Sequence, residues 1–179
     1  MKSKYTVLFI TLITFLPFHS LSFGQDRGNG RARPSPNAAV SQNIGTTIVS
    51  VTYGRPGLKG RALESLTPAG KVWRTGANES AAITFSGDVL VGGKAVSAGT
   101  YSLYTIPGDD EWTIIINSKL SWGTQYDKAM DVVRTSAGVS SGSQTEWFEI
   151  DFDTLSNSKA HLNLRWGTKI VSVPIEVKS

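Results

Sequence analysis

The stretch TIVSVTY, residues 47–53, decides the fold class of this chain. Every second residue from Thr47 to Tyr53 would lie on one side of an extended strand, and three of those four side chains are apolar or aromatic. A period of two is that of a β-strand with one buried face, whereas a helix repeats its buried positions every three to four residues. The stretch therefore predicts a strand, and the same pattern recurs along the chain.

Turn residues between alternating runs predict two hairpins. In VLVGGKAV, residues 89–96, both glycines can take the positive φ angles of a type I′ turn. In YSLYTIPGDDEWTIIIN, residues 101–117, the proline fixes φ, and the glycine and aspartates that follow tolerate a tight turn. We therefore expect an antiparallel pair of strands around each of these two turns.

The C-terminal part of the chain shows the same alternation three more times, at residues 148–152, 162–166 and 171–177. Turn signals recur about every 8–12 residues, which is typical of a β-sandwich or barrel. The sequence therefore predicts an all-β fold, an antiparallel β-sandwich or flattened barrel of roughly nine to ten strands. One or two short helical turns are expected, near residues 63–66 and 125–131.

The first residues predict export. Lys2 and Lys4 form a basic start, residues 5–18 carry no charge, and small residues at Ser22 and Gly24 are typical of a signal-peptide cleavage site. The apolar run is shorter than the about 20 residues that a membrane span needs. We therefore expect a signal peptide over residues 1–24 rather than a retained anchor. The protein would be periplasmic or secreted, with no membrane insertion after cleavage.

The composition of the remaining chain suggests one domain behind a leader. Residues 25–37 are rich in Gly, Arg, Pro, Asn and Ser, which predicts a disordered leader, and residues 38–179 form a single β-sandwich domain. The absence of cysteine excludes disulfides, thiolate metal sites and a lipid anchor on cysteine. The net charge of +4 falls by two when residues 1–24 are removed, so we expect no nucleic-acid partner. The oligomeric state stays open.

Several motifs are more specific than ordinary strand sequence. They are YGRP (residues 53–56), KVWRTGANE (71–79), AGTYSL (98–103) and LRWG (164–167). Taken in this order, they resemble the exported bacterial proteins grouped as domain of unknown function 2911, over about residues 34–175. The resemblance implies an exported β-rich domain and brings no known reaction. The chain departs mildly from this family at residues 138–144, a Ser/Gly-rich segment that we expect to form a loop.

The densest polar cluster of the sequence lies in and near the first two of these motifs. The candidate ligand-binding residues are Arg55, Lys59, Arg61, Trp73, Arg74, Asn78 and Glu79. Arginine binds carboxylate, phosphate or sugar hydroxyl groups, asparagine donates and accepts hydrogen bonds, and tryptophan offers an apolar ring with a polar edge. The leading hypothesis is a binding or envelope-associated module that holds a small polar ligand, a glycan or an anion. No cofactor and no metal are expected.

Two alternatives to a binding module stay open. A glycosidase-like hydrolase would use Glu79 and a second carboxylate, for which Asp127 or Asp131 can be nominated. A purely structural envelope protein would use the same arginines and Glu79 as an internal ion-pair network that holds the loop after Gly54.

Other chemistries have less support. His161 is the single histidine outside residues 1–24, so neither a serine triad nor a zinc site is expected. The acidic clusters at 109–111 and 151–153 lack the spacing of a calcium loop. Trp166 is in phase with core leucines, whereas Trp122 and Trp147 are the tryptophans to test for stacking on a sugar.

Overall fold

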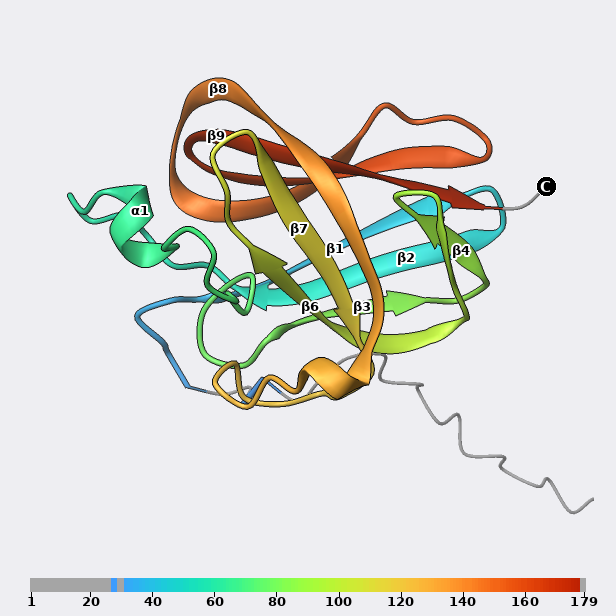
Figure 1. Cartoon of the computed structure of the whole chain (residues 1–179), viewed down its shortest axis with the longest axis horizontal. Helices are drawn as coiled ribbons and strands as arrows, with labels where there is room; N and C mark the ends of the chain where they lie inside the picture. The colour runs from blue at the N-terminus through green and yellow to red at the C-terminus, as the bar shows by residue number, and fades with distance from the viewer. Residues whose placement is uncertain (1–26, 29–30, 178–179) are drawn as a thin grey trace, which may run out of the picture.

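The computed structural model describes residues 27–28 and 31–177, and the predicted signal peptide over residues 1–24 lies outside them. Nine strands make up most of the described chain (Figure 1). They are β1 (Asn37–Ile44), β2 (Thr47–Gly54), β3 (Ala81–Phe85), β4 (Val89–Val91), β5 (Lys94–Val96), β6 (Gly99–Ile106), β7 (Glu111–Asn117), β8 (Asp131–Asp153) and β9 (Lys159–Val177). Helix in the described residues is limited to α1 (Leu63–Leu66) and the 3-10 turn η1 (Lys128–Met130), and none of it is long and apolar enough to cross a membrane.

The strands form one antiparallel sheet of order β1-β2-β3-β6-β7-β8-β9-β4-β5. β8 and β9 are 23 and 19 residues long and curve across the molecule, so that the two halves of the sheet face each other (Figure 1). β1 contacts β8 and β9 across the gap between these halves, but it pairs only with β2. The all-β prediction is therefore confirmed, and the sheet is folded over itself without closing into a barrel.

Both predicted hairpins are present. β4 pairs with β5 across Gly92 and Gly93, whose φ angles of 55° and 77° are the positive values that a type I′ turn needs. β6 pairs with β7 from Ser102 opposite Asn117 onward. The two predicted helical turns are confirmed as α1 and η1.

The loop expected at residues 138–144 is wrong. This segment belongs to β8, where Val139 faces Val171 and the register shifts only after Ser141. Serine and glycine have weak strand propensity, but Gly138 pairs with β7 and residues 139–141 pair with β9, and this pairing continues the strand here. The two strands expected at 162–166 and 171–177 are likewise one continuous strand, β9.

The hydrophobic core lies between the two halves of the folded sheet. Val49 and Val51 of β2 are fully buried, and Leu162 and Ile175 of β9 expose at most 1% of their surface. Ile48 lies between the buried residues Thr47 and Val49 and exposes 47% of its surface, so the strand buries one face only. The alternation read from residues 47–53 thus describes the actual burial of β2.

The opposite face of β6 and β7 is covered by the segment between β7 and β8. Tyr104 alternates with the core residue Leu103, and its fully buried ring packs edge-to-face on Tyr126 with centroids 5.0 Å apart. The Tyr104 hydroxyl lies 3.0 Å from Oγ of Ser121. Residues 118–130 therefore lie over this face and reach the loop that precedes β3.

Candidate functional site

No hydrogen bond, ion pair or ring contact of the described residues joins the side chains of the seven candidates to one another. Three of them, Arg55, Lys59 and Arg61, lie on the segment that follows β2. Three others lie on residues 74–80, which we call the site loop, and the last one, Trp73, packs against the core. The three groups have different partners and are described separately.

The first group holds its own segment against β8. Arg55 donates from Nε to the carbonyl oxygen of Phe148 at 2.8 Å, and Arg61 donates to two carbonyl groups of its own segment at 2.8 and 2.9 Å. Nζ of Lys59 lies 5.6 Å from the ring centre of Trp147, which is 37% exposed. These contacts explain how the segment is ordered against β8.

The site loop is held at both ends and strained between them. Trp73 and Thr105 exchange two backbone hydrogen bonds of 2.7 and 2.9 Å, and the first residue of β3 donates to the carbonyl of Arg74 at 3.0 Å. Thr75 and Asn78 have φ angles of 53° and 67°, in the left-handed region that non-glycine residues seldom adopt and β-branched residues least of all. Such strain persists where surrounding contacts enforce it, and it clusters at functional sites.

The carboxylate of Glu79 takes its charge partners from the N-terminal residues. Nη1 of Arg33 donates to Oε2 at 2.8 Å and to Oε1 at 3.1 Å, and Nη2 of Arg27 lies 3.8 Å from Oε2. Glu79 is 5% exposed and Arg27 is 4% exposed. We call Glu79 with these two arginines the Glu79 face. Sequence reasoning missed both arginines because they lie in the predicted leader, where composition gave no sign of contacts with the domain.

The Glu79 face sets the protonation state of its acid. Burial alone would raise the pKa of the Glu79 carboxyl, but the hydrogen bond from Arg33 and the positive charges of both arginines outweigh it and lower the pKa below its usual value. Glu79 is therefore an ionised acceptor at neutral pH. That state suits an anchor for arginine and does not suit a proton donor to a leaving group.

Arg74 shares the site loop but has different surroundings. Its half-buried side chain runs along Gly123, where an added Cβ would overlap the Arg74 methylene groups. Its Nε is buried without a hydrogen-bond partner, and no acid of the described residues forms an ion pair with it. The neighbouring Trp122 is 55% exposed. We call Arg74 with Trp122 and Gly123 the Arg74 face.

Residues 35–175 match the family model described as protein of unknown function, DUF2911. The chain belongs to the DUF2911 family. The match confirms the resemblance that the motifs indicated and includes the whole Arg74 face, whereas Arg27 and Arg33 precede it. No curated protein and no solved structure matches the chain.

The DUF2911 domain packs the ring of the half-buried Trp73 against its core. The Trp73 ring stacks on Trp166 with centroids 5.6 Å apart and packs edge-to-face against Phe148 and Trp112. Adjacent residues of an extended segment point to opposite sides, so Trp73 can face the core while Arg74 faces outward. Trp166 is 3% exposed, which confirms its predicted place in the core.

The acids nominated for hydrolysis are engaged within the DUF2911 domain. Asp127 caps η1 by accepting from a backbone amide at 3.0 Å. Asp131 accepts from Asn117 and from Tyr126, each at 2.7 Å, and forms an ion pair of 2.6 Å with Arg134. The described part of the chain contains no group of three or more side chains that could hold a metal ion.

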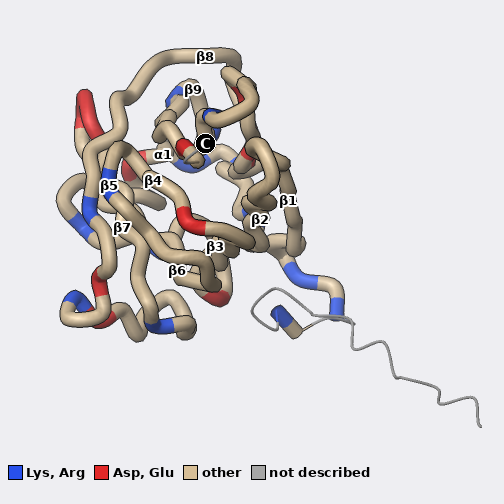
Figure 2. Tube along the Cα trace, turned by 90° about the vertical axis from the view of Figure 1, so that its right-hand side faces the viewer, with Lys and Arg blue, Asp and Glu red and all other residues tan. Residues whose placement is uncertain are grey.

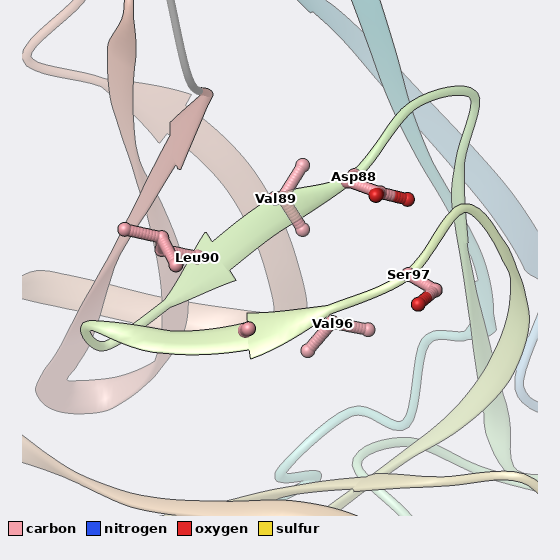
Figure 3. Close-up of a pocket in the computed structure, with 6 residues that line it drawn as sticks. Asp88, Val89, Leu90, Val96 and Ser97 are labelled. Atoms are coloured by element: carbon pink, nitrogen blue, oxygen red, sulfur yellow. The ribbon is translucent and has the colours of Figure 1, made fainter.

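Two shallow hollows of the DUF2911 domain lie apart from the Arg74 face. One, of about 100 Å³, lies at β4 and β5, with Asp88 and Ser97 at the same end of the strand pair (Figure 3). The carboxylate of Asp88 already accepts a hydrogen bond from the amide of Ala98 at 2.8 Å. The other, of about 240 Å³, lies beside α1 and includes Arg61 and Lys169. Neither hollow is lined by Arg74 or Trp122.

Proposed function

We propose that this DUF2911 domain is a binding module that holds a small anionic ligand, an acidic sugar or an organic anion, on the Arg74 face. The observation that carries the proposal is the unpaired guanidinium of Arg74, whose Nε is buried without a partner. Leaving a buried polar group unsatisfied costs roughly 1–3 kcal/mol. A carboxylate or phosphate from a ligand would supply the missing negative charge at the guanidinium group.

Trp122 supports a sugar as the carrier of that anionic group. Its indole exposes 55% of its surface, although tryptophan is highly buried on average in folded proteins. A backbone bridge between Glu79 and Trp122 ties this residue to the site loop. An acidic sugar combines a carboxylate for Arg74 with a ring whose apolar side can pack on the indole.

The backbone and the charge distribution also favour a local site. The backbone hydrogen bonds of Trp73 with Thr105, and of Ala81 with Arg74, hold the loop that carries Arg74, so little ordering entropy would be lost on binding. Figure 2 shows basic and acidic residues interspersed along the fold. Attraction of an anion would therefore depend on the Arg74 guanidinium itself rather than on a broad basic surface.

Binding is favoured over the two alternatives by the partners of the charged groups. Glu79 is held ionised by two arginines, and Asp131 is held by three partners, so neither is placed to move a proton. A purely structural role fits the Glu79 face but leaves the unpaired charge of Arg74 without a purpose. The periplasmic or secreted location belongs to the same proposal and follows from residues 1–24.

A thermal-shift screen tests this proposal. The full-length chain would be expressed, and the protein purified in the form that the cell leaves after processing. Its Tm would be measured with acidic sugars, neutral oligosaccharides and organic anions. A ligand at 100 times its Kd stabilises by about 2.7 kcal/mol, which raises Tm by about 5–10 °C in a domain of this size. We expect such a shift with a ligand that carries a carboxylate or phosphate.

Matched variants locate the site. Arg74→Met keeps the methylene packing on Gly123 and removes the charge, so it should abolish the shift, whereas Arg61→Met should keep it because Arg61 donates to carbonyl groups of its own segment. Trp122→Phe should weaken a sugar more than a small anion. A shift that survives in Arg74→Met, or a screen in which no anionic ligand shifts Tm, would contradict the proposal.

A further inference from the structure

Gly123 lies in a turn against the stem of Arg74. The amide of Gln125 donates to the carbonyl oxygen of Trp122 at 2.9 Å and so closes a β-turn. The two central residues of this turn, Gly123 and Thr124, have no positive φ angle, so the turn itself does not need a glycine. The missing side chain, rather than the backbone conformation, is therefore what distinguishes glycine at this position.

Arg74 occupies the space that a side chain at position 123 would fill. An added Cβ atom would overlap Cδ of Arg74 and lie 2.7 Å from both its Cβ and its Cγ, and these are the three nearest atoms. The stem of Arg74 thus lies directly on the backbone of the glycine. Rotation of the Arg74 side chain would not relieve this contact completely, because rotation about its side-chain bonds does not move its Cβ.

The turn and the site loop are joined to each other, so they do not readily move apart. The amide of Ser80 donates to the carbonyl oxygen of Ser121 at 3.3 Å, and its hydroxyl donates to the same oxygen at 2.9 Å. A backbone bridge links Glu79 to Trp122. The stem of Arg74 therefore lies between two segments whose separation is set by these contacts.

We infer that Gly123 is a positioning residue of the Arg74 face: by leaving room for the stem of Arg74, it fixes where the guanidinium group meets an anionic ligand. The inference rests on the proposed function, which supplies that ligand. A larger residue at position 123 would push the stem outward, and the guanidinium group would leave the place where its Nε is now buried. The effect of Gly123 on affinity would thus act through Arg74.

Hydrogen exchange at the Arg74 side chain measures this positioning without a ligand. Its Nε–H group is buried, so the proton should exchange slowly with water, and its NMR signal is identified by its absence in Arg74→Met. Gly123→Ala should speed the exchange about tenfold or more, because the group becomes exposed. Gly138→Ala is the matched control, since Gly138 has no positive φ angle and an added Cβ there would meet no atom of the described chain within 4 Å beyond its sequence neighbours. It should leave the exchange rate unchanged, and an unchanged rate in Gly123→Ala would overturn the inference.

A double-mutant cycle shows whether the added methyl group acts on Arg74. Gly123→Ala should lower Tm by about 5 °C through overpacking. In an Arg74→Ala chain it should lower Tm by less than about half of that, because Cγ and Cδ of Arg74 are gone. Equal losses in the two chains would mean that the methyl group meets something other than Arg74, and would overturn the inference. Should Gly123→Ala not fold, recovery of folding in the double variant supports the inference, and no recovery overturns it.

Calorimetric titration with glucuronate, which joins a carboxylate to a sugar ring, connects Gly123 to binding. The Kd should rise about tenfold or more in Gly123→Ala and stay within about twofold of the wild type in Gly138→Ala, since a displaced guanidinium group no longer meets the anion. An unchanged Kd in Gly123→Ala would overturn the role of Gly123 in binding, even if exchange at Arg74 were faster. Absence of binding to the wild type would overturn the proposed function and, with it, this role in affinity. Hydrogen exchange and the double-mutant cycle would then still decide whether Gly123 holds the stem of Arg74 in place.

Discussion

Glu79 and Arg74 lie on the same site loop, yet only one of the two charges has a charged partner among the described residues. Glu79 is buried, and nitrogens of Arg27 and Arg33 lie 3.8 and 2.8 Å from its carboxylate, so its charge is neutralised. Arg74 is half-buried and has no acid within ion-pair distance among the described residues, and its Nε is unsatisfied. The chain thus supplies the charge partners of Glu79 from its own residues, whereas the described residues supply none for Arg74.

This difference teaches how to interpret a cluster of charged residues in a sequence. Charged residues that satisfy one another inside the fold contribute to structure, because breaking a buried pair leaves an uncompensated charge that costs several kcal/mol. A charged residue that the fold leaves unsatisfied is where a ligand gains most by binding. The following predictions test whether the two faces differ as the contacts indicate.

Glu79→Gln should have the largest effect on stability. It removes a buried charge that two arginines share and leaves Arg27 buried with a neutral partner, so we expect a loss of about 3 kcal/mol or more in the free energy of unfolding. Glu149→Gln is the matched control, because the Glu149 side chain is 45% exposed and lies 3.7 Å from Arg55; it should cost less than about 1 kcal/mol. Urea unfolding at pH 7 measures both. Equal losses would remove the contrast between buried and exposed pairs.

The stability that Glu79 contributes should also depend on pH. The pKa of Glu79 in the folded chain lies below the usual 4.5. The ionised carboxylate therefore contributes its full stabilisation at pH values above 4.5. This contribution is lost as the pH falls through the folded-state pKa. The gap in unfolding free energy between the wild type and Glu79→Gln should therefore be constant near neutral pH and close in acid. A gap that widens as the pH falls would mean that Glu79 is not held ionised.

Local patterns predicted the fold well and the site only in part. The strand alternation at residues 47–53 and the turn at Gly92 and Gly93 depend on neighbours in sequence, so they could be read directly. The partners of Glu79 could not, because Arg27 lies 52 residues away in a segment whose composition is that of a leader. The sequence could have predicted that Trp73 and Arg74 point in different directions, since adjacent residues of an extended segment face opposite sides.

The smallest effect is expected for Arg74→Met, and it is the most direct test of the comparison. The substitution keeps the methylene packing along Gly123 and removes a charge that has no acidic partner, so no ion pair is lost. It also removes a buried donor that has no acceptor, which offsets the lost hydration of the charge. We expect a change of less than about 1 kcal/mol in the free energy of unfolding at pH 7, in contrast to Glu79→Gln. A loss as large as that of Glu79→Gln would show that Arg74 is held by the fold, and the Arg74 face would then be part of the structural network and not a place for a ligand.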